Sequence, residues 1–334
     1  MPVKIHVDSG CFVSAKSVSA NDYVVRKPKP WYKKMLHQWD LQLLVIPALI
    51  YVLIFFYGPM YGVITAFQEF RLGDTFGRSE WVGLHHFRVL FNGPNFGRMM
   101  RNNLIMGGLR VFIGFPIPII FAVLLNELRN KTFKKTTQTI SYLPFFISWV
   151  VAATLLFDFF SVDNGAVNNF LLWAGLIDEP IFFFGRSQYF HGMFIGTHIW
   201  KQLGWDAIIF IAAITAIDTE QYEAASIDGA GRIQKMWHIT IKGIMPTIII
   251  LFILNIGSLM ATSFDQVMTL TQLMNNALLR ETAEIFQTYA FRIGIGHRRF
   301  SYGTAVNLFT TMINFTLLLL ANGIARRKSE TSLF

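Results

Sequence analysis

The chain has 334 residues, of which 53% are hydrophobic and 15% are charged, and its mean hydropathy is +0.43. Ordinary soluble domains carry about 25% charged residues, so this composition excludes such a fold and indicates a membrane protein. The net charge of +9 would suggest nucleic acid in a soluble protein. In a membrane protein it follows from Lys and Arg retained in cytoplasmic loops, so no nucleic-acid partner is expected.

Residues 1–40 form a polar tail that is rich in Lys and Arg and contains the single cysteine, Cys11. One cysteine excludes an intramolecular disulfide and a cysteine-based metal cluster. At the end of the tail, residues 31–39 mix Trp, Tyr and Lys, which is typical of a helix lying in the lipid headgroup layer. We therefore expect a cytoplasmic tail that ends in an interfacial helix.

Six apolar stretches follow, each long enough to cross a bilayer, which takes about 20 residues. They cover residues 41–67, 103–125, 140–160, 192–217, 245–264 and 304–325. The sequence thus predicts an all-α integral membrane protein with a six-span domain over residues 41–325 and a short tail over 326–334. Lys and Arg gather in the tail 1–40, in the loops after the second and fourth spans, and after the sixth span. This bias places both termini in the cytoplasm.

The loop between the fourth and fifth spans, residues 218–244, reads as two short helices joined by a glycine turn. Asp218 is a helix N-cap with Gln221 three residues later, which is a capping-box pattern. Gly229 is a typical residue to end that helix. In the second helix, Ile233, Met236 and Trp237 follow helical spacing, so we expect them to pack under the spans. The other face would project into the cytoplasm.

The same loop resembles the EAA loop of binding-protein-dependent ABC importer permeases. The residues that carry the resemblance are Glu223, Ala224, Ala225, Asp228, Gly229, Ala230, the aromatic Trp237 and Ile239. The resemblance implies the type I importer fold, in which this loop docks on the ATPase subunit and transmits its closure. One departure concerns the end of the second helix. The family has a proline after Ile-x-Leu, whereas here Lys242 follows Ile241 and the next proline is Pro246, so the kink is expected to move or to disappear.

Three further segments resemble the large-carbohydrate, LplB-type branch of these permeases: residues 58–62, 81–87 and 303–306. The resemblance implies a bacterial inner-membrane complex. Its other parts would be a second permease, two ATPase subunits and an extracytoplasmic solute-binding protein. The substrates of this branch are oligosaccharides, including acidic ones such as alginate fragments. Arginines in the expected outer segments suit such a substrate, although neighbouring acids offset part of their charge.

Polar and aromatic residues inside the expected spans are candidates for the substrate path, because such residues are costly in a bilayer. They are Arg110 in the second span, Trp200, Lys201, Trp205 and Asp206 in the fourth, and Phe264, Asp265 and Gln266 at the end of the fifth. The Trp rings could stack on sugars, and the charged groups could bind hydroxyls. The alternative is that they pack against a partner subunit or serve as ordinary loop residues.

The chain contains no phosphate-binding P-loop, no zinc-type His pair with an acid and no nucleophile elbow. We therefore expect a transport subunit without an ATPase site or cofactor of its own, with ATP and Mg²⁺ bound by the partner ATPase. The alternatives are an ion-coupled secondary transporter, which the lack of acidic pairs in the spans disfavours, and a membrane scaffold.

Overall fold

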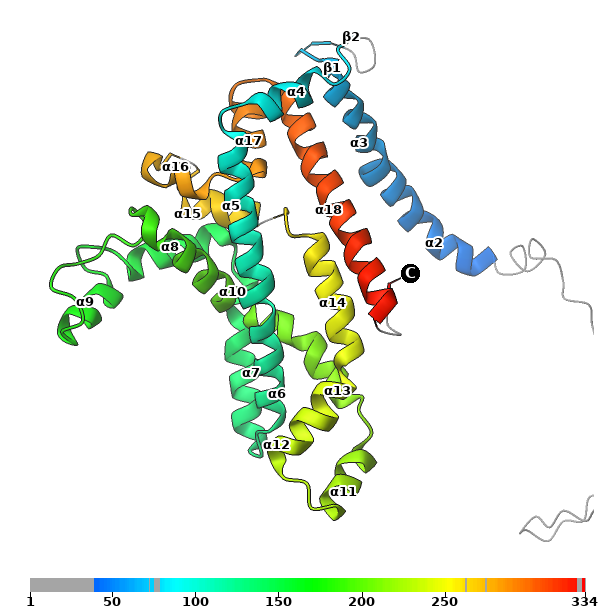
Figure 1. The fold of residues 1–334 in the computed structure, drawn as a ribbon, viewed down its shortest axis with the longest axis vertical. Coiled ribbons are helices and arrows are strands. Elements are labelled where there is room, and N and C mark those ends of the chain that lie inside the picture. Colours follow the sequence, from blue (N-terminus) through cyan, green and yellow to red (C-terminus); the bar gives the residue numbers. More distant parts are fainter. Residues whose placement is uncertain are drawn as a thin grey trace, which may run out of the picture. The chain divides into compact units, whose positions relative to one another are not determined.

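The computed structural model describes residues 39–71, 73–74, 79–261, 263–273, 275–328 and 332–333, and within these ranges the chain is helical with one short strand pair (Figure 1). The expected interfacial helix at 31–39 lies outside the described residues except for its last position. The chain forms two compact units, residues 1–61 and 62–334.

The described part of the first unit is a continuous apolar helical run with a local change of pitch. It contains α2 (Trp39–Val52), the π-helical turn η1 (Leu53–Tyr57) and α3 (Gly58–Met60). The helical run extends through the 3₁₀ turn η2 (Tyr61–Phe67), and residues 42–67 together are long and apolar enough to cross a membrane. The first predicted span is confirmed.

The second unit begins with a small polar cap. Strands β1 (Gln68–Glu69) and β2 (Glu80–Trp81) pair antiparallel, with Gln68 opposite Trp81, and α4 (His85–Asn92) follows. The buried ring of His86 lies 3.1 Å from the Gln68 carbonyl oxygen and fixes α4 to β1. These elements lie at one end of the unit, and α11 and α12 lie at the other (Figure 1).

Three helical columns form the centre of the second unit. The first is α5 (Phe96–Leu109), the π-helical turn η3 (Arg110–Gly114) and α6 (Pro116–Asn126), and it confirms the second predicted span. The others are α7 (Lys131–Phe146) and the 29-residue α10 (Ser187–Thr215). Helix α10 packs along both α6 and α7. Helix α10 approaches α7 closely at Gly204, because this residue has no side chain that would collide with the Ser141 carbonyl oxygen.

The predicted third span, 140–160, is wrong as a single helix. Helix α7 ends at Phe146, α8 (Trp149–Phe159) begins after Ser148, and the two axes differ by 106°. The Ser148 hydroxyl accepts a hydrogen bond from Val151 N at 3.2 Å, so Ser148 is an N-cap that starts a new helix. Helix α9 (Ala166–Trp173) continues the lateral arm that α8 begins (Figure 1).

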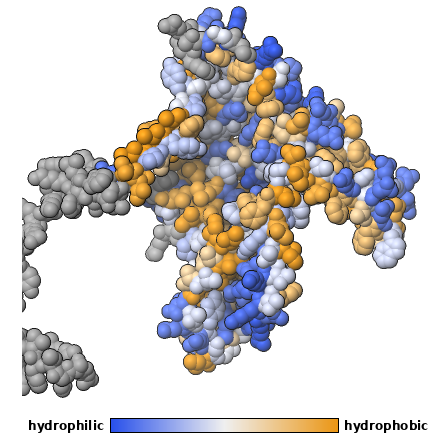
Figure 2. Space-filling view, turned by 180° about the vertical axis from the view of Figure 1, so that it is seen from behind, coloured by the Kyte–Doolittle hydropathy of each residue, from blue (hydrophilic) through white to orange (hydrophobic). Residues whose placement is uncertain are grey.

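The chain then passes through α11 (Thr219–Ile227), α12 (Arg232–Lys235), the π-helical turn η4 (Met236–Thr240) and α13 (Ile241–Gly243) into α14 (Met245–Gly257). Hydrophilic and hydrophobic side chains are mixed on the surface at the end of the unit where α11 and α12 lie (Figure 2). The predicted fifth span, 245–264, is shorter than expected because α14 ends at Gly257.

The described residues between α14 and α18 include four short helical elements. They are α15 (Phe264–Leu270), α16 (Ala277–Ala283), α17 (Phe286–Phe291) and the π-helical turn η5 (Arg292–Gly296). In this connection, the fully buried carboxylate of Glu284 accepts hydrogen bonds from Arg98 at 2.7 Å and from Arg292. This pairing holds the connection against α5.

Helix α18 (Phe300–Lys328) closes the chain and contains the sixth predicted span. Within the described residues, three helical segments are long and apolar enough to cross a membrane, or six if each of three bent helix pairs counts as one span. The fold agrees with the six-span prediction on that second count.

Candidate functional site

The α11–α12 turn has the predicted helix-turn-helix form. Asp218 caps α11, with its carboxylate accepting from Glu220 N at 3.0 Å rather than from Gln221 as the capping-box pattern predicts. Gly229 has φ +76°, and the amides of Gly229 and Ala230 donate to the carbonyls of Ser226 and Ala225. This is a Schellman motif, which ends a helix and reverses the chain.

Side-chain contacts fix the turn to the rest of the unit. The hydroxyls of Tyr222 and Thr240 are hydrogen-bonded at 2.9 Å, which joins α11 to η4. Arg232 forms an ion pair with Glu127 at 3.1 Å and also donates to the Glu127 carbonyl, which joins the start of α12 to the end of α6. These contacts fix the turn to the end of the α5–α6 column and to η4, which leads into α14.

The outward surface of this turn is apolar at its tip. Ile227 is 87% exposed, Ile233 is 76% exposed and Trp237 is 61% exposed. The prediction that Ile233 and Trp237 pack under the spans is wrong; of that set, only Met236 contacts the buried cluster there. Trp237 lies in the π-helical turn η4, where an extra residue per turn shifts the following side chains off the regular helical face.

Glu223, Ala224 and Asp228 are exposed, and Ala225 and Ala230 are half-buried. Ala225, Asp228, Gly229 and Ala230 line a hollow of about 340 Å³ between the two helices, together with Gln234, Lys235, His238 and Ile239. The structure thus gathers the whole predicted coupling set on one protruding element.

The helix after this turn is still kinked, although the proline predicted by the family pattern is missing. The segments 232–243 and 245–257 differ in direction by 58°, and the break falls at Ile244, just before Pro246. Pro246 lies in the first turn of α14, where a proline needs no hydrogen-bond donor. The kink has therefore moved from position 242 to position 244.

A second site lies between the helical columns. A pocket of about 270 Å³ is bounded by η3, α6, α10 and α14. Its polar lining consists of Arg110, His198, Gln202, Asp206, Asn255 and Ser258. Arg110 donates to the Ala261 carbonyl at 3.2 Å, while its Nε atom has no hydrogen-bond partner within the described chain. The same holds for the Gln202 side-chain oxygen. The residues that line the pocket include both hydrogen-bond donors and acceptors.

Two of the predicted substrate-path residues, Arg110 and Asp206, meet in this pocket, and the rest do not. Gln202, Asn255 and Ser258 were not predicted. The signal for Gln202 was present, because His198, Gln202 and Asp206 recur at four-residue spacing on one face of a helix.

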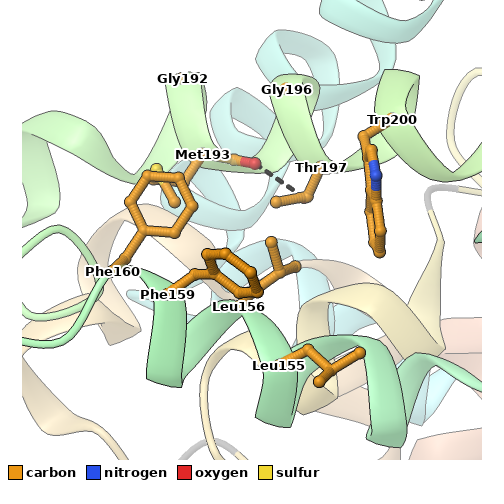
Figure 3. A pocket seen from close by; sticks show the side chains of 9 residues that line it. All are labelled: Leu155, Leu156, Phe159, Phe160, Gly192, Met193, Gly196, Thr197 and Trp200. Carbon is orange, nitrogen blue, oxygen red and sulfur yellow. Dashed lines mark hydrogen bonds between the residues drawn. The ribbon is translucent and has the colours of Figure 1, made fainter. Parts of the chain in front are cut away.

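Trp200 lines a different pocket, of about 380 Å³, between α8 and α10 (Figure 3). Its other walls are almost entirely apolar, and they include Phe159, Phe160 and Met193. Trp205 stacks on Phe145 with the ring centroids 4.1 Å apart, so that its ring packs against α7. Lys201 is 5% exposed and donates to the carbonyls of Pro144 and Phe145.

The three candidates at the start of α15 lie outside the polar pocket. Gln266 is fully buried, and its amide donates to Phe194 O and Thr197 Oγ1 at 2.7 and 3.0 Å, so it joins α15 to α10. Phe264 packs against Phe291 in a tilted arrangement and lines a separate pocket between α17 and α18. Asp265 is exposed.

Comparison with known proteins shows what the chain is similar to. The profile of the family described as "Binding-protein-dependent transport system inner membrane component" matches residues 114–330. The chain is 42% identical over 304 residues to Protein LplB of Bacillus subtilis (strain 168), covering 91% of this chain and 94% of that protein. It is 41% identical over 320 residues to the polygalacturonan/rhamnogalacturonan transport system permease protein YteP of the same organism, covering 96% and 98%.

Among solved structures, the chain is similar to one in the crystal structure of a bacterial alginate ABC transporter in complex with an alginate pentasaccharide-bound periplasmic protein. The TM-score is 0.81 at 35% sequence identity, and the match covers 91% of this chain and 99% of that chain. A chain in a crystal structure of a bacterial ABC transporter for the import of alginate matches with a TM-score of 0.79 at 36% identity, covering 89% of this chain and 98% of that chain.

Proposed function

This chain belongs to the family of binding-protein-dependent transport system inner membrane components, and we propose that it is one of two different permeases in an ATP-driven importer of acidic oligosaccharides. Its relatives are permease subunits of ABC transporters, so the chain is a membrane-embedded transport subunit and not an enzyme. It works with a substrate-binding protein and other components of the transporter.

The observation that carries the proposal is the α11–α12 turn. Helices that protrude from a membrane domain with exposed Ile227, Ile233 and Trp237 have apolar surface to bury against another protein. Acidic Glu223 and Asp228 adjoin this surface and add polar contacts at its rim. The occupant is the ATPase, which holds ATP and Mg²⁺. Its closure would move the turn, and the Arg232–Glu127 and Tyr222–Thr240 contacts would pass that movement to α6 and α14.

The polar pocket around Arg110 suits the substrate. Two relatives are named for alginate and for polygalacturonan and rhamnogalacturonan, which are acidic polysaccharides. The guanidinium of Arg110 would bind a uronate carboxylate, and Gln202 and Asp206 would accept hydrogen bonds from sugar hydroxyls. Alternating access would expose this pocket first to the binding protein and then to the cytoplasm.

Reconstitution tests the proposed assembly. In proteoliposomes, ATP-dependent uptake of a uronate oligosaccharide should require this chain, the second permease, the ATPase and the binding protein together. Liposomes that hold this chain alone should take up nothing, because the sequence has no P-loop. Uptake by the chain alone, driven by an ion gradient, would contradict the proposal and favour a secondary transporter.

Arg110→Gln tests the substrate site. Losing one charged hydrogen bond costs roughly 1.5–3 kcal/mol, or about 10-fold to 100-fold in preference. We expect that loss in the uptake ratio of a uronate oligosaccharide to its carboxyl-reduced counterpart, offered at equal concentration. Arg88→Gln, at an exposed position on α4, is the control and should leave the ratio unchanged. Equal losses for both sugars in Arg110→Gln would place Arg110 outside the substrate site.

A further inference from the structure

Lys201 presents an unusual combination of burial and charge. Its side chain is 5% exposed, and its ammonium donates to the Phe145 carbonyl at 2.8 Å and to the Pro144 carbonyl at 3.2 Å. The ion pairs found within the described residues do not include Lys201. A buried ammonium is costly, so its position needs compensating contacts.

The compensation comes from the break between α7 and α8. The last carbonyls of a helix have no partner within the helix and carry partial negative charge. Helix α7 ends at Phe146, so the Pro144 and Phe145 carbonyls belong to its last turn. The same ammonium lies 5.4 Å from the ring centroids of Phe145 and Trp149, one on each side of the break. One cation therefore contacts both helices of the corner.

The corner is also fixed to α10 by neighbours of Lys201. Gly204 allows the backbones of α10 and α7 to touch, and Trp205 stacks on Phe145 with an interplanar angle of 1°. Lys201, Gly204 and Trp205 thus hold one face of α10 against α7. Gln202, which follows Lys201, and Asp206, which follows Trp205, line the polar pocket.

We propose that Lys201 is a positioning residue: it clamps the α7–α8 corner to α10 and thereby sets the rotation of α10 that presents Gln202 and Asp206 to the substrate. This inference rests on the proposed function, because it assigns a role within the same transport site. Lys201 acts through α7, α8 and α10 and does not itself touch the sugar. The break between α7 and α8 is then a corner that specific contacts stabilise, and not a chance interruption of the third span.

The test compares Lys201→Met with Lys201→Arg in the full transporter. Two spin labels, at Val150 on α8 and Ala212 on α10, are placed in a Cys11→Ser background. The distance between them reports how α8 is positioned relative to α10. Both positions are exposed, and neither side chain is among the contacts of Lys201, although Val150 directly follows Trp149. The distance distribution between the labels should be narrow in the parent, broad in Lys201→Met and narrow again in Lys201→Arg, which restores the cation and its donors.

The uptake rate should change in parallel with the geometry of the α7–α8 corner. Lys201→Met should lower the maximal uptake rate roughly 10-fold to 100-fold, because misplaced contact groups lose that much. The loss should be equal for uronate oligosaccharides and their carboxyl-reduced counterparts, and Lys201→Arg should recover most of the rate. A loss confined to the acidic sugar, with an unchanged distance distribution, would overturn the proposal and make Lys201 a substrate ligand.

Ser148→Ala supplies an independent arm in case Lys201→Met fails to insert. It removes the N-cap of α8 and leaves Lys201 in place, so the distribution should broaden and uptake should fall. A broadened distance distribution in Ser148→Ala together with full uptake would overturn the proposal. The distance measurement does not depend on transport. If the proposed function is wrong, the parent transporter will carry no oligosaccharide, while the distance distribution will still change in Lys201→Met.

Discussion

The backbone conformation of Gly229 sets the angle between α11 and α12 in the coupling turn. Its φ of +76° lies in the left-handed region, and nothing lies within 4 Å of where a Cβ atom would sit. A substitution there is therefore strained by conformation and not by collision. Gly231, two residues later, has φ −69°, a value that any residue adopts.

We predict that Gly229→Val abolishes most transport while the chain still inserts. The strain at a positive φ costs roughly 1–3 kcal/mol locally and would redirect α12. Gly231→Ala is the matched control and should transport normally, because a Cβ there would meet only the Gln234 side-chain oxygen, at an ordinary contact distance of 3.8 Å, and the backbone is ordinary. The measurement is substrate-stimulated ATP hydrolysis and uptake by the complete assembly. Wild-type coupling in Gly229→Val would show that the angle of this turn does not matter.

Side-chain roles at the residue scale were only partly predictable from the sequence. Gly229 could be assigned because a helix end followed by a new helix requires a positive φ. Lys201, a charge within a predicted span, is ambiguous in sequence, because carbonyls freed by a helix break 56 residues earlier in the chain leave no pattern. Asn255 and Ser258 are polar residues in an apolar run, and only the three-dimensional packing of α14 brings them to Arg110.

At the scale of elements, long apolar helices were predictable and their interruptions were not. The spans in residues 42–67, in α5–α6 and in α18 follow from length and hydropathy. At the 106° corner after Phe146, Ser148 caps α8 and the distant Lys201 binds the Pro144 and Phe145 carbonyls, and the 58° kink before Pro246 falls where α13 ends. The short helices α15, α16 and α17 were not predicted, because each has only six or seven residues and the pairing of Glu284 with Arg98 and Arg292 leaves no local pattern in the sequence.

We predict that Glu284→Gln loosens the connection between α14 and α18. Breaking a buried ion pair costs about 3 kcal/mol or more, because it leaves the partner charges uncompensated. Arg98 and Arg292 are about a quarter exposed on their side chains, so water offsets part of that cost. Glu281→Gln, at an exposed position, is the control and should change little. Protease cleavage of detergent-purified protein within 275–299 should accelerate in Glu284→Gln alone. Equal protection of both variants would show that the triad is not what orders the segment.

For the whole molecule, the charge bias predicts that both termini lie in the cytoplasm. The end of the second unit that carries α11 and α12 would then face the cytoplasm, and α4 with β1 and β2 would face outward. A phosphatase that is active only outside the cytoplasm should stay inactive when fused after Phe334. Activity of that fusion would invert the topology and place the coupling turn on the wrong side for an ATPase.

Coupling through the α11–α12 turn requires that this turn contact the ATPase, and photo-crosslinking from position 237 measures that contact directly. Trp237 is 61% exposed at the tip of the turn, and Phe315, 60% exposed on α18, is the matched control on a membrane-spanning face. With benzoylphenylalanine in place of Trp237, illumination of the assembled transporter should join this chain to the ATPase subunit. The same label in place of Phe315 should not. An ATPase adduct from position 315 and none from position 237 would contradict the assignment of the turn as the coupling element.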